Sequence, residues 1–238
     1  MKNVLITGGS RGIGAAMVRL FSENGYNVAF TYKSSETEAN ALSEETGAIA
    51  IKADSRSEEQ ILSAVGFAEK SIGNIDILIN NAAISSFSLF TDITLEDWNG
   101  IFSTNVTAAF LYSKAALRGM INKKCGRIIN VSSVWGLTGA SCEVHYSATK
   151  SALIGMTKAL AKELAPSGIT VNAIAPGVID TDMNKNISRE DMEALLEEIP
   201  LGRIANPREV AEAALFLASE RASYITGEVI NVSGGFYV

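Results

Sequence analysis

The stretch NVLITGGSRGIG, residues 3–14, combines a short apolar run with closely spaced glycines. The apolar run predicts a buried β-strand, and Gly8, Gly12 and Gly14 predict a tight turn that leads into a helix. Glycines at such a turn let the backbone approach a pyrophosphate, while the N–H groups of the helix face the anion. The spacing is G-x-x-x-G-x-G, and we expect it to bind a dinucleotide cofactor.

Six further apolar runs, rich in Val and Ile, follow along the chain: residues 26–32, 48–53, 75–80, 126–132, 169–175 and 228–232. Their near-continuous hydrophobicity is typical of strands buried on both faces of a parallel sheet. Segments of helical length lie between them, including 15–24, 57–72, 95–122 and 147–165. This alternation predicts an α/β, doubly wound (Rossmann) fold with helices on both faces of the sheet, in a single domain covering residues 1–238.

The composition excludes several classes of function. A net charge of −6 argues against general nucleic-acid binding, which needs a basic face. One histidine and two widely separated cysteines, Cys125 and Cys142, make a metal site or a disulfide framework improbable. The sequence has no apolar run long enough to span a membrane and no signal peptide, so we expect a cytoplasmic protein that does not bind membranes.

The end of the second strand indicates which dinucleotide is bound. NAD enzymes place an acidic residue there for the ribose 2′-hydroxyl, but this strand ends in Thr-Tyr-Lys-Ser, residues 31–34. Arg11 and Lys33 could instead meet the 2′-phosphate of NADP(H), although both could also be solvated surface cations. Asp54, after the third strand, suits either the adenine edge or a helix cap.

Five motifs occur together: TGGSRGIG at 7–14, NNAA at 80–83, NVSS at 130–133, YSATK at 146–150 and PGVIDTDM at 176–183. This combination resembles the short-chain dehydrogenase/reductase family over essentially the full length. The ending ASYITGEVINVSGGFYV and the overall run are most similar to the 3-oxoacyl-[acyl-carrier-protein] reductases within that family. The resemblance implies a seven-stranded parallel sheet, a nicotinamide cofactor and a homotetramer.

The resemblance also implies site residues. The catalytic set is Asn105, Ser133, Tyr146 and Lys150, with Ser132 the neighbour most easily mistaken for Ser133. In the family, the asparagine holds a water that links the lysine to solvent. The cofactor-binding residues are expected to be Gly8, Ser10, Arg11, Gly12, Ile13, Gly14, Lys33, Asp54, Asn81, Ala82, Tyr146, Lys150, Pro176, Gly177, Ile179 and Thr181.

Tyr146 and Lys150 suit proton transfer to a ketone oxygen. A phenol has a pKa near 10, so an unaided tyrosine is a sluggish acid at neutral pH. Lys150 lies four residues on, on the same helix face, and its charge should lower that pKa. Ser133 can donate a hydrogen bond to the substrate oxygen. His145 points elsewhere, since adjacent helical positions diverge, and we expect it only to fill or edge the pocket.

The substrate side is expected to involve Ser133 and Tyr146 together with Ser85, Trp135 and Cys142, and Phe87, Leu137 and Val144 are further candidates. A flexible lid is expected at about 183–205, and its segment 188–200 has Met192, Leu195, Leu196 and Ile199 on one side. A packed surface helix would explain that pattern nearly as well. Small residues along 147–165 fit either a helix buried in its own domain or a subunit interface.

These features predict an oxidoreductase that reduces a ketone with NADPH, with a 3-oxoacyl thioester in fatty acid synthesis as the first candidate substrate. The alternatives are a reductase of a free small molecule, such as a sugar, steroid or simple alcohol, and an inactive cofactor-binding regulator. For a substrate held on the acidic acyl carrier protein, Lys123, Lys124 and Arg127 are expected beside the active-site entrance. A second basic position of the resembled enzymes falls at Ser167, which is uncharged here, and the acidic chain would repel the carrier at long range.

Overall fold

The computed structural model describes residues 1–182 and 189–237. Within these residues seven strands form one sheet in the order β3-β2-β1-β4-β5-β6-β7, and every neighbouring pair is parallel. The strands are β1 (Asn3–Ile6), β2 (Asn27–Tyr32), β3 (Ile49–Lys52), β4 (Ile77–Asn80), β5 (Gly126–Val131), β6 (Ile169–Pro176) and β7 (Val229–Val232). Each lies within an apolar run of the sequence, except that β6 ends one residue beyond its run, so the predicted seven-stranded parallel sheet is confirmed.

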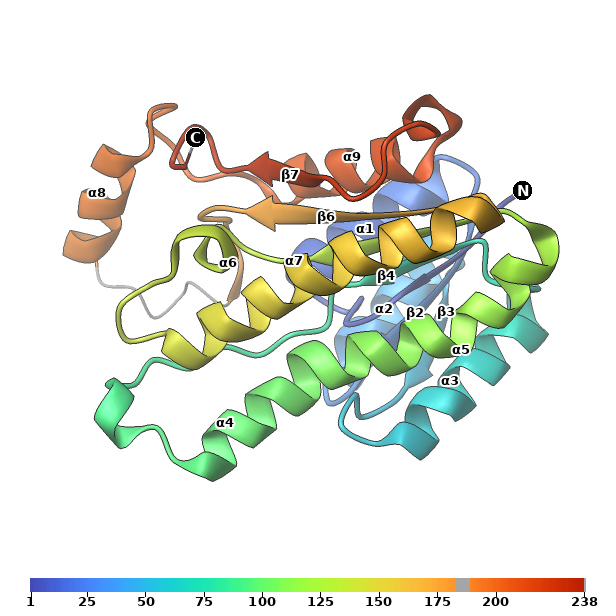
Figure 1. Cartoon of the computed structure of the whole chain (residues 1–238), viewed down its shortest axis with the longest axis horizontal. Coiled ribbons are helices and arrows are strands. Elements are labelled where there is room, and N and C mark those ends of the chain that lie inside the picture. Colours follow the sequence, from blue (N-terminus) through green and yellow to red (C-terminus); the bar gives the residue numbers. More distant parts are fainter. Residues whose placement is uncertain (183–188, 238) are drawn as a thin grey trace.

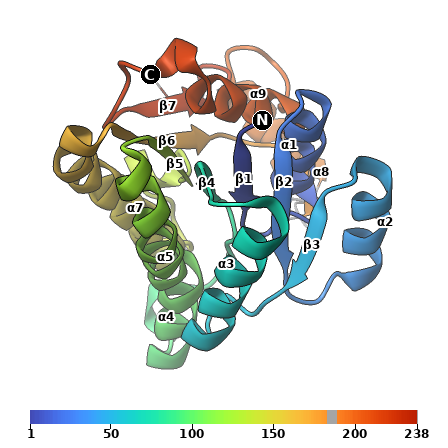
Figure 2. The same cartoon turned by 90° about the vertical axis from the view of Figure 1, so that its right-hand side faces the viewer.

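Helices cover both faces of this sheet, as Figure 2 shows. One face carries α1 (Gly12–Glu23) and α9 (Pro207–Ala218), with α2 (Glu36–Thr46) beside α1. The other face carries α3 (Glu58–Ile72), α5 (Ala108–Lys123) and α7 (Val144–Leu164). Shorter helices, α4 (Leu95–Phe102), α6 (Trp135–Thr138) and α8 (Arg189–Glu198), lie towards one end of the molecule (Figure 1).

Alternating side chains of the central strands explain why their sequences are apolar throughout. Val4 and Ile6 of β1 join the core under α1 and α9, whereas Leu5 joins the core under α3 and α5. All three are fully buried. A strand covered on both faces exposes neither set of side chains to water, so most of its positions are apolar. None of the helices among the described residues is both long enough and apolar enough to cross a membrane.

Two helices differ from the sequence prediction in informative ways. The segment 95–122 is not one regular helix, because Ser103–Thr107 forms a π-helical turn between α4 and α5. Such a turn inserts an extra residue and is frequent at functional sites. The predicted helix 147–165 begins earlier, at Val144, so His145 and Tyr146 both lie in the first turn of α7.

The order of the strands fixes where a ligand can bind. The chain reverses its direction of winding between β1 and β4, which are neighbours in the sheet although β2 and β3 separate them in sequence. Open parallel sheets bind ligands outside the carboxyl ends of their strands at this point. The segments after β1, β4, β5 and β6 all leave the sheet at that edge, which we call the carboxyl edge. The opposite side is the amino edge.

Candidate active site

The glycine turn after β1 is shaped by backbone contacts that leave no room for side chains. Gly8 has φ +65°, and a Cβ there would lie 2.8 Å from the Cα of Ala82. A Cβ on Gly14 would lie 2.1 Å from the carbonyl oxygen of Gly8. Gly12 has φ +53° and opens α1, whose first turn carries no acidic residue. This is a backbone cradle at a helix N-terminus, and it fits the pyrophosphate of a dinucleotide.

Thr7 and Asn81 brace this turn against the end of β4. The Thr7 hydroxyl accepts hydrogen bonds from the backbone N–H groups of Asn81 and Ala82, each at 3.0 Å. The Asn81 side chain donates to the carbonyl oxygens of Thr7 and Gly8, also at 3.0 Å. Both amide protons of Asn81 are therefore engaged within the chain. Sequence reasoning missed Thr7, whose only signal was its place between the apolar run and the first glycine.

Three charged residues expected around the adenosine end behave differently from one another. Arg11 is exposed, and its side chain has no hydrogen-bond or ion-pair partner among the described residues, although its carbonyl accepts from the N–H of Ala15. Lys33 forms an ion pair with Asp54 at 3.0 Å, and Arg56 binds the same carboxylate at 2.8 Å. These cations hold the pKa of Asp54 well below its usual value, chiefly through the hydrogen bond from Arg56. Asp54 does not cap α3, because Ser57 accepts the capping bond from Gln60.

The segment after β6 lies against the glycine turn. A Cβ on Gly12 would come within 3.3 Å of the Thr181 side chain, so these residues face one another closely. The carbonyl of Pro176 accepts from Val134, and the N–H of Gly177 donates to Val232, at 2.9 and 3.0 Å. Ile179 is buried and forms a bridge with Ala205. The structure thus brings Gly12 and Thr181, both predicted to bind the cofactor, to the two sides of one opening.

Ser133, Tyr146 and Lys150 come together where β5 ends and α7 begins. All three are buried, and the Ser133 hydroxyl lies close enough to that of Tyr146 to lower its pKa. The ammonium group of Lys150 donates to the carbonyl of Val131 at 2.8 Å and lies 5.4 Å from the centre of the Tyr146 ring. Ser132 instead donates to the carbonyl of Lys150 at 2.8 Å, so its hydroxyl holds α7 against β5.

The electrostatics of this pair correct one expectation from the sequence. Burial raises the pKa of Tyr146 well above its usual value, and the negative charge of Glu143 raises that pKa further. The neighbouring Ser133 hydroxyl lowers it, but by less. Burial also lowers the pKa of Lys150 from 10.5 to about 7. Lys150 binds Val131 and does not lower the tyrosine pKa in this structure, because removal from water outweighs its charge. Tyr146 is therefore a protonated phenol at neutral pH.

Asn105 occupies the π-helical turn and is buried. Its amide group donates to the carbonyl of Ile84 at 2.9 Å and to the Thr149 hydroxyl at 3.1 Å. Its oxygen accepts from the N–H of Ile84 at 2.9 Å. The side chain thus joins the segment after β4 to α7. One acceptor position of the oxygen is left, so the expected water remains a prediction.

A second polar network, missed by sequence reasoning, lies beneath these residues. Asn80 on β4 donates to Asn130 on β5 at 2.8 Å and to Ser113 on α5 at 3.1 Å. Asn130 in turn donates to Thr157 on α7 at 2.8 Å. Buried polar groups that are paired fix the relative positions of the elements that carry them. This network fixes α5 and α7 on the two central strands.

The residues predicted on the substrate side lie around the start of α7. Ser85 donates to the carboxylate of Glu143 at 2.5 Å, and the carbonyl of Cys142 accepts from Ser88 at 2.8 Å. The backbone N–H of Trp135 donates to Ser133 at 3.1 Å. The structure therefore brings Ser85, Trp135 and Cys142 to the same end of the molecule as Tyr146, with α4, α6 and α8 around them (Figure 1).

The predicted lid lies only partly within the described residues, since 183–188 are outside them. Its helix, α8, has the expected sidedness: Met192, Leu195 and Leu196 are half-buried, whereas Glu193 and Glu197 are exposed. Ile199 is buried, and the N–H of Leu201 donates to Gly234 at 3.1 Å. The base of this segment is thus attached to the turn after β7.

The cation cluster expected beside the entrance lies elsewhere. Lys123, Lys124 and Arg127 precede or begin β5, so they are at the amino edge, and Figure 1 places the end of α5 away from the start of α7. Arg127 is buried and contacts Glu220 at 3.4 Å, while Lys123 pairs with Asp76 at 2.7 Å. The expectation that these cations lie beside the entrance is wrong within a single chain. The cations and Ser133 are both near β5 in sequence, but they lie at opposite ends of that strand.

Comparisons with known proteins agree with this geometry. A family model described as enoyl-(acyl carrier protein) reductase matches residues 8–237. The chain is 46% identical to the 3-oxoacyl-[acyl-carrier-protein] reductase FabG of Aquifex aeolicus, over 98% of this chain and 96% of that one. It is 44% identical to the enzyme of the same name from Vibrio harveyi, over 100% and 98%.

Two further similarities concern substrate and structure. The acetoacetyl-CoA reductase of Rhizobium meliloti is 41% identical, over 98% of this chain and 97% of that one. A solved structure, a mutant of a Serratia marcescens short-chain dehydrogenase/reductase, superposes with a TM-score of 0.94 at 36% identity. That comparison covers 100% of this chain and 98% of the other.

Proposed function

The chain belongs to the short-chain dehydrogenase/reductase family, and from this we propose that it reduces a 3-oxoacyl thioester to the 3-hydroxyacyl thioester with NADPH, in fatty acid synthesis. The observation that carries the proposal is the burial of the neighbouring Ser133 and Tyr146 hydroxyls together with Lys150 at the carboxyl edge. Two hydroxyls at one point suit a carbonyl oxygen. The names of the most similar relatives support the thioester class.

The chain's own residues would supply the proton and the orientation. When bound, the reduced nicotinamide supplies a hydride to the carbonyl carbon, and the carbonyl π electrons move to oxygen. Ser133 donates a hydrogen bond to that oxygen as its charge develops. Tyr146 gives its proton to the same oxygen, and its raised pKa keeps the proton in place until then. Lys150 replaces that proton, since a lysine with a pKa of about 7 exchanges protons readily at neutral pH.

The choice of NADP(H) over NAD(H) belongs to the same proposal. The Arg11 side chain extends from the glycine turn without a partner among the described residues, as a cation that meets a 2′-phosphate should. The turn lies against the end of β2, where the N–H of Gly9 donates to Thr31 at 2.9 Å. Lys33 follows that strand end, and its pairing with Asp54 leaves it at the surface.

Acyl carrier protein and coenzyme A are both candidate carriers of the acyl group. The two FabG relatives favour acyl carrier protein, and the Rhizobium relative favours coenzyme A. The distribution of charges favours coenzyme A. The cations expected to bind an acidic carrier protein lie at the amino edge, away from Tyr146. Near the end of the molecule that holds Tyr146, α8 instead exposes Glu193, Glu197 and Glu198. We retain acyl carrier protein as the first candidate and coenzyme A as the second.

A homotetramer is also part of the proposal. One face of α7 is buried through Leu153, Ile154 and Thr157, whereas Ser151, Gly155 and Ala159 are exposed. On the neighbouring α5, the Phe110 side chain is exposed as well. An outer surface with small residues and an exposed aromatic ring supports close packing against another copy. Light scattering in solution would measure the mass, and a monomeric mass would contradict this part.

A turnover assay tests the main proposal. NADPH and NADH should each be offered with acetoacetyl groups on acyl carrier protein, on coenzyme A and on a small thiol, and with free sugar and steroid ketones. We expect NADPH oxidation with the thioesters and much slower reaction with the free ketones. Preference for a free ketone, or no turnover of any ketone, would contradict the proposal. The ratio of the KM values for the acyl carrier protein thioester and the coenzyme A thioester distinguishes the first candidate from the second.

A further inference from the structure

His145 is a buried titratable residue that the proposed mechanism does not use. It is the only histidine of the chain and directly precedes Tyr146. Its ring is 1% exposed, and Nε2 lies 2.6 Å from the hydroxyl of Ser86. Its other ring nitrogen, Nδ1, is buried and has no hydrogen-bond partner among the described residues. The single polar contact of this ring therefore reaches the segment that follows β4.

The unequal surroundings of the two ring nitrogens indicate which one carries the proton. Buried N–H donors left without an acceptor are rarer in folded proteins than acceptors left without a donor. With the proton on Nε2, only the lone pair of Nδ1 is unpaired, and Nε2–H donates to Ser86. With the proton on Nδ1, a buried N–H is left alone. The arrangement thus favours the neutral ring with its proton on Nε2.

The segment 84–88 is attached to its surroundings almost entirely by hydrogen bonds. Ser85 binds Glu143, Ser86 binds His145 and Ser88 binds the carbonyl of Cys142, at 2.5, 2.6 and 2.8 Å. All three partners lie at or just before the first turn of α7. At its beginning, Ile84 is held on both backbone groups by Asn105. Tyr146 follows His145 directly, so the position of this segment is set relative to the reacting hydroxyl.

Apolar packing does little to hold the same segment. Phe87 is 79% exposed and Ile84 is also exposed, as are Leu89 and Phe90 just beyond the segment. A loop that does not bury its own apolar side chains lacks the main source of free energy that fixes loops. Its conformation therefore depends on the hydrogen bonds to α7, and each of them limits how far the loop opens.

We propose that His145 is a positioning residue that holds Ser86, and with it residues 84–88, against the start of α7, and so fixes one wall of the substrate pocket. It does not touch the reacting atoms and does not exchange the proton. The inference rests on the proposed function, because that function places the substrate at Tyr146. It predicts that loss of the Nε2 contact weakens substrate binding and leaves proton transfer nearly intact.

Two substitutions of His145 separate this contact from the rest of the ring. The amide of Gln reaches about as far as Nε2, whereas the amide of Asn reaches only as far as Nδ1, which has no partner. We expect His145→Asn and Ser86→Ala to raise the KM of the thioester about 2- to 10-fold, the range for one neutral hydrogen bond. His145→Gln should restore a KM close to that of the unchanged protein, and kcat and the KM of NADPH should change less than twofold throughout.

The double variant His145→Asn/Ser86→Ala tests whether the two residues act as one contact. Its KM should equal that of either single variant, since the same bond is lost only once. Multiplied effects of the two substitutions would overturn the proposal. So would an unchanged KM in His145→Asn, or a fall in kcat with KM unchanged. A KM raised as much in His145→Gln as in His145→Asn would also overturn the proposal, because the ring would then serve another role.

A measurement that needs no activity uses the single histidine. Nitrogen-15 NMR of protein labelled at histidine and carrying no histidine tag should show one ring whose neutral form carries its proton on Nε2. Ser86→Ala should shift the Nε2 resonance and speed exchange of its proton with water. A ring protonated on Nδ1, or a spectrum unaffected by Ser86→Ala, would overturn the inference. Turnover that survives Tyr146→Phe would instead contradict the proposed function, so the two failures are distinguishable.

Discussion

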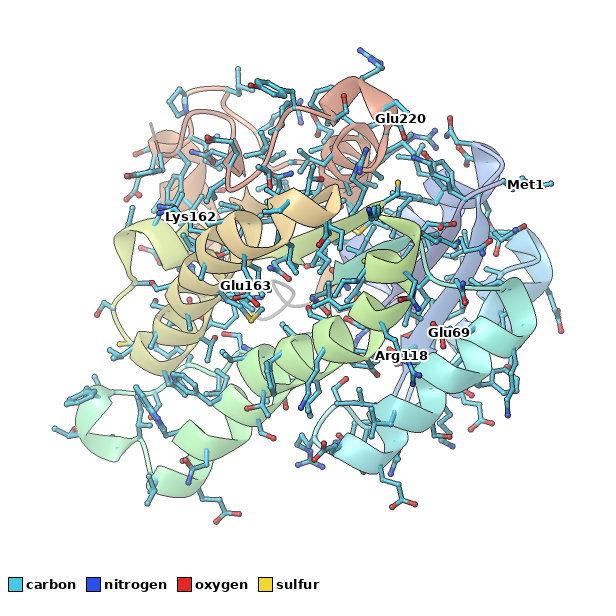
Figure 3. All side chains as sticks on the ribbon, turned by 45° about the vertical axis from the view of Figure 1, so that its right-hand side comes forward. Met1, Glu69, Arg118, Lys162, Glu163 and Glu220 are labelled. Carbon is cyan, nitrogen blue, oxygen red and sulfur yellow. The ribbon has the colours of Figure 1, made fainter. Side chains whose placement is uncertain are left out.

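The two edges of the sheet hold very different kinds of polar group. At the carboxyl edge, Ser133, Tyr146 and Lys150 are buried, and the side chains of Ser133 and Lys150 are hydrogen-bonded to the backbone. At the amino edge, Lys2 and Arg127 both contact Glu220, and Lys123 pairs with Asp76. Figure 3 shows Met1, Glu69, Arg118 and Glu220 bordering this edge. Burial is the main cause of the shifted pKa values of Tyr146 and Lys150, whereas the ion pair with Lys2 is the main cause of the lowered pKa of Glu220.

This difference shows that the role of a polar residue depends on which end of a strand it follows or precedes. Ser133 and Arg127 are separated by a single strand in sequence, yet that strand carries them to opposite sides of the molecule. Groups at the carboxyl edge are enclosed by α6, α7 and the segment after β4. Lys124, by contrast, is exposed, in a left-handed conformation after α5, with its carbonyl beside Gly168. Burial rather than charge alone separates the two regions.

Tyr146→Phe should have the largest effect on turnover of the substitutions at the carboxyl edge. The substitution keeps the buried ring and removes the proton donor, so turnover should fall at least 10²- to 10⁴-fold, the usual contribution of general acid catalysis. Binding of NADPH, measured by fluorescence, should be nearly unchanged. Tyr224→Phe, at a fully exposed tyrosine, is the matched control and should keep full activity. A Tyr146→Phe enzyme with more than a tenth of normal kcat would rule out the assigned role.

Lys150 makes stability depend on pH in a defined direction. Its pKa is lowered to about 7 in the folded chain, from 10.5, so between these values the unfolded chain binds a proton that the folded chain has released. The free energy of unfolding should therefore rise with pH from about 7 to 9.5, by at most about 1.4 kcal/mol per pH unit, and the contribution should be flat below pH 7. Lys150→Met should remove this slope in urea unfolding.

Lys124→Met makes the same substitution at the amino edge and serves as the control for Lys150→Met. Lys124 is exposed, and Lys124→Met should leave the pH dependence of unfolding as it is in the unchanged protein. Equal slopes for the unchanged protein and for Lys150→Met would show that the buried lysine keeps its ordinary proton affinity. The absolute stability of Lys150→Met is not the measured quantity, since that variant also leaves the carbonyl of Val131 without its donor.

Cofactor preference tests the two cations beside the glycine turn. Arg11→Ala combined with Lys33→Ala should lower kcat/KM for NADPH about 10- to 100-fold, the value of one charge-assisted hydrogen bond, and spare NADH. Arg19→Ala is the control, because this arginine lies on the same helix but pairs with Glu45 at 2.8 Å. The assignment of NADPH would fail if the unchanged protein used both cofactors with equal kcat/KM.

The smallest effect is expected at the amino edge. Lys124→Glu should leave the KM of a coenzyme A thioester unchanged, because the residue lies far along β5 from Tyr146. If acyl carrier protein docks at this edge, the same variant should raise the KM of the carrier-bound substrate a few-fold at low salt, and added salt should reduce the difference. Lys70→Glu provides the same change of charge on α3. Identical effects of the two variants would exclude a specific carrier site at Lys124.

Much of the fold and of the candidate site was predictable because local patterns determine both. The seven apolar runs gave the strands, and the glycines at 8, 12 and 14 sit where a strand passes into a helix. Ser133, Tyr146 and Lys150 were identified by resemblance and spacing, and the structure brings them together. These features depend on residues that are close together in the sequence, so they can be predicted from the sequence alone.

The features that were missed depend on partners far along the chain. Thr7 meets residues of the segment after β4, and Asn80 meets Asn130 and, through it, Thr157. The pKa of Tyr146 was predicted in the wrong direction, because spacing showed the nearby lysine but not the enclosure of both groups. The cation cluster was misplaced because nearness in sequence was taken for nearness in space.

The π-helical turn at Ser103–Thr107 has a consequence for chain length. Each residue of a regular helix advances it by about 100°. Removing one residue from this turn would let α4 and α5 continue as one regular helix, but it would rotate one relative to the other by that angle. Asn105 would then leave the space between Ile84 and Thr149. A related sequence that is one residue shorter here could keep every apolar position and the fold, and still lack the asparagine where the site needs it.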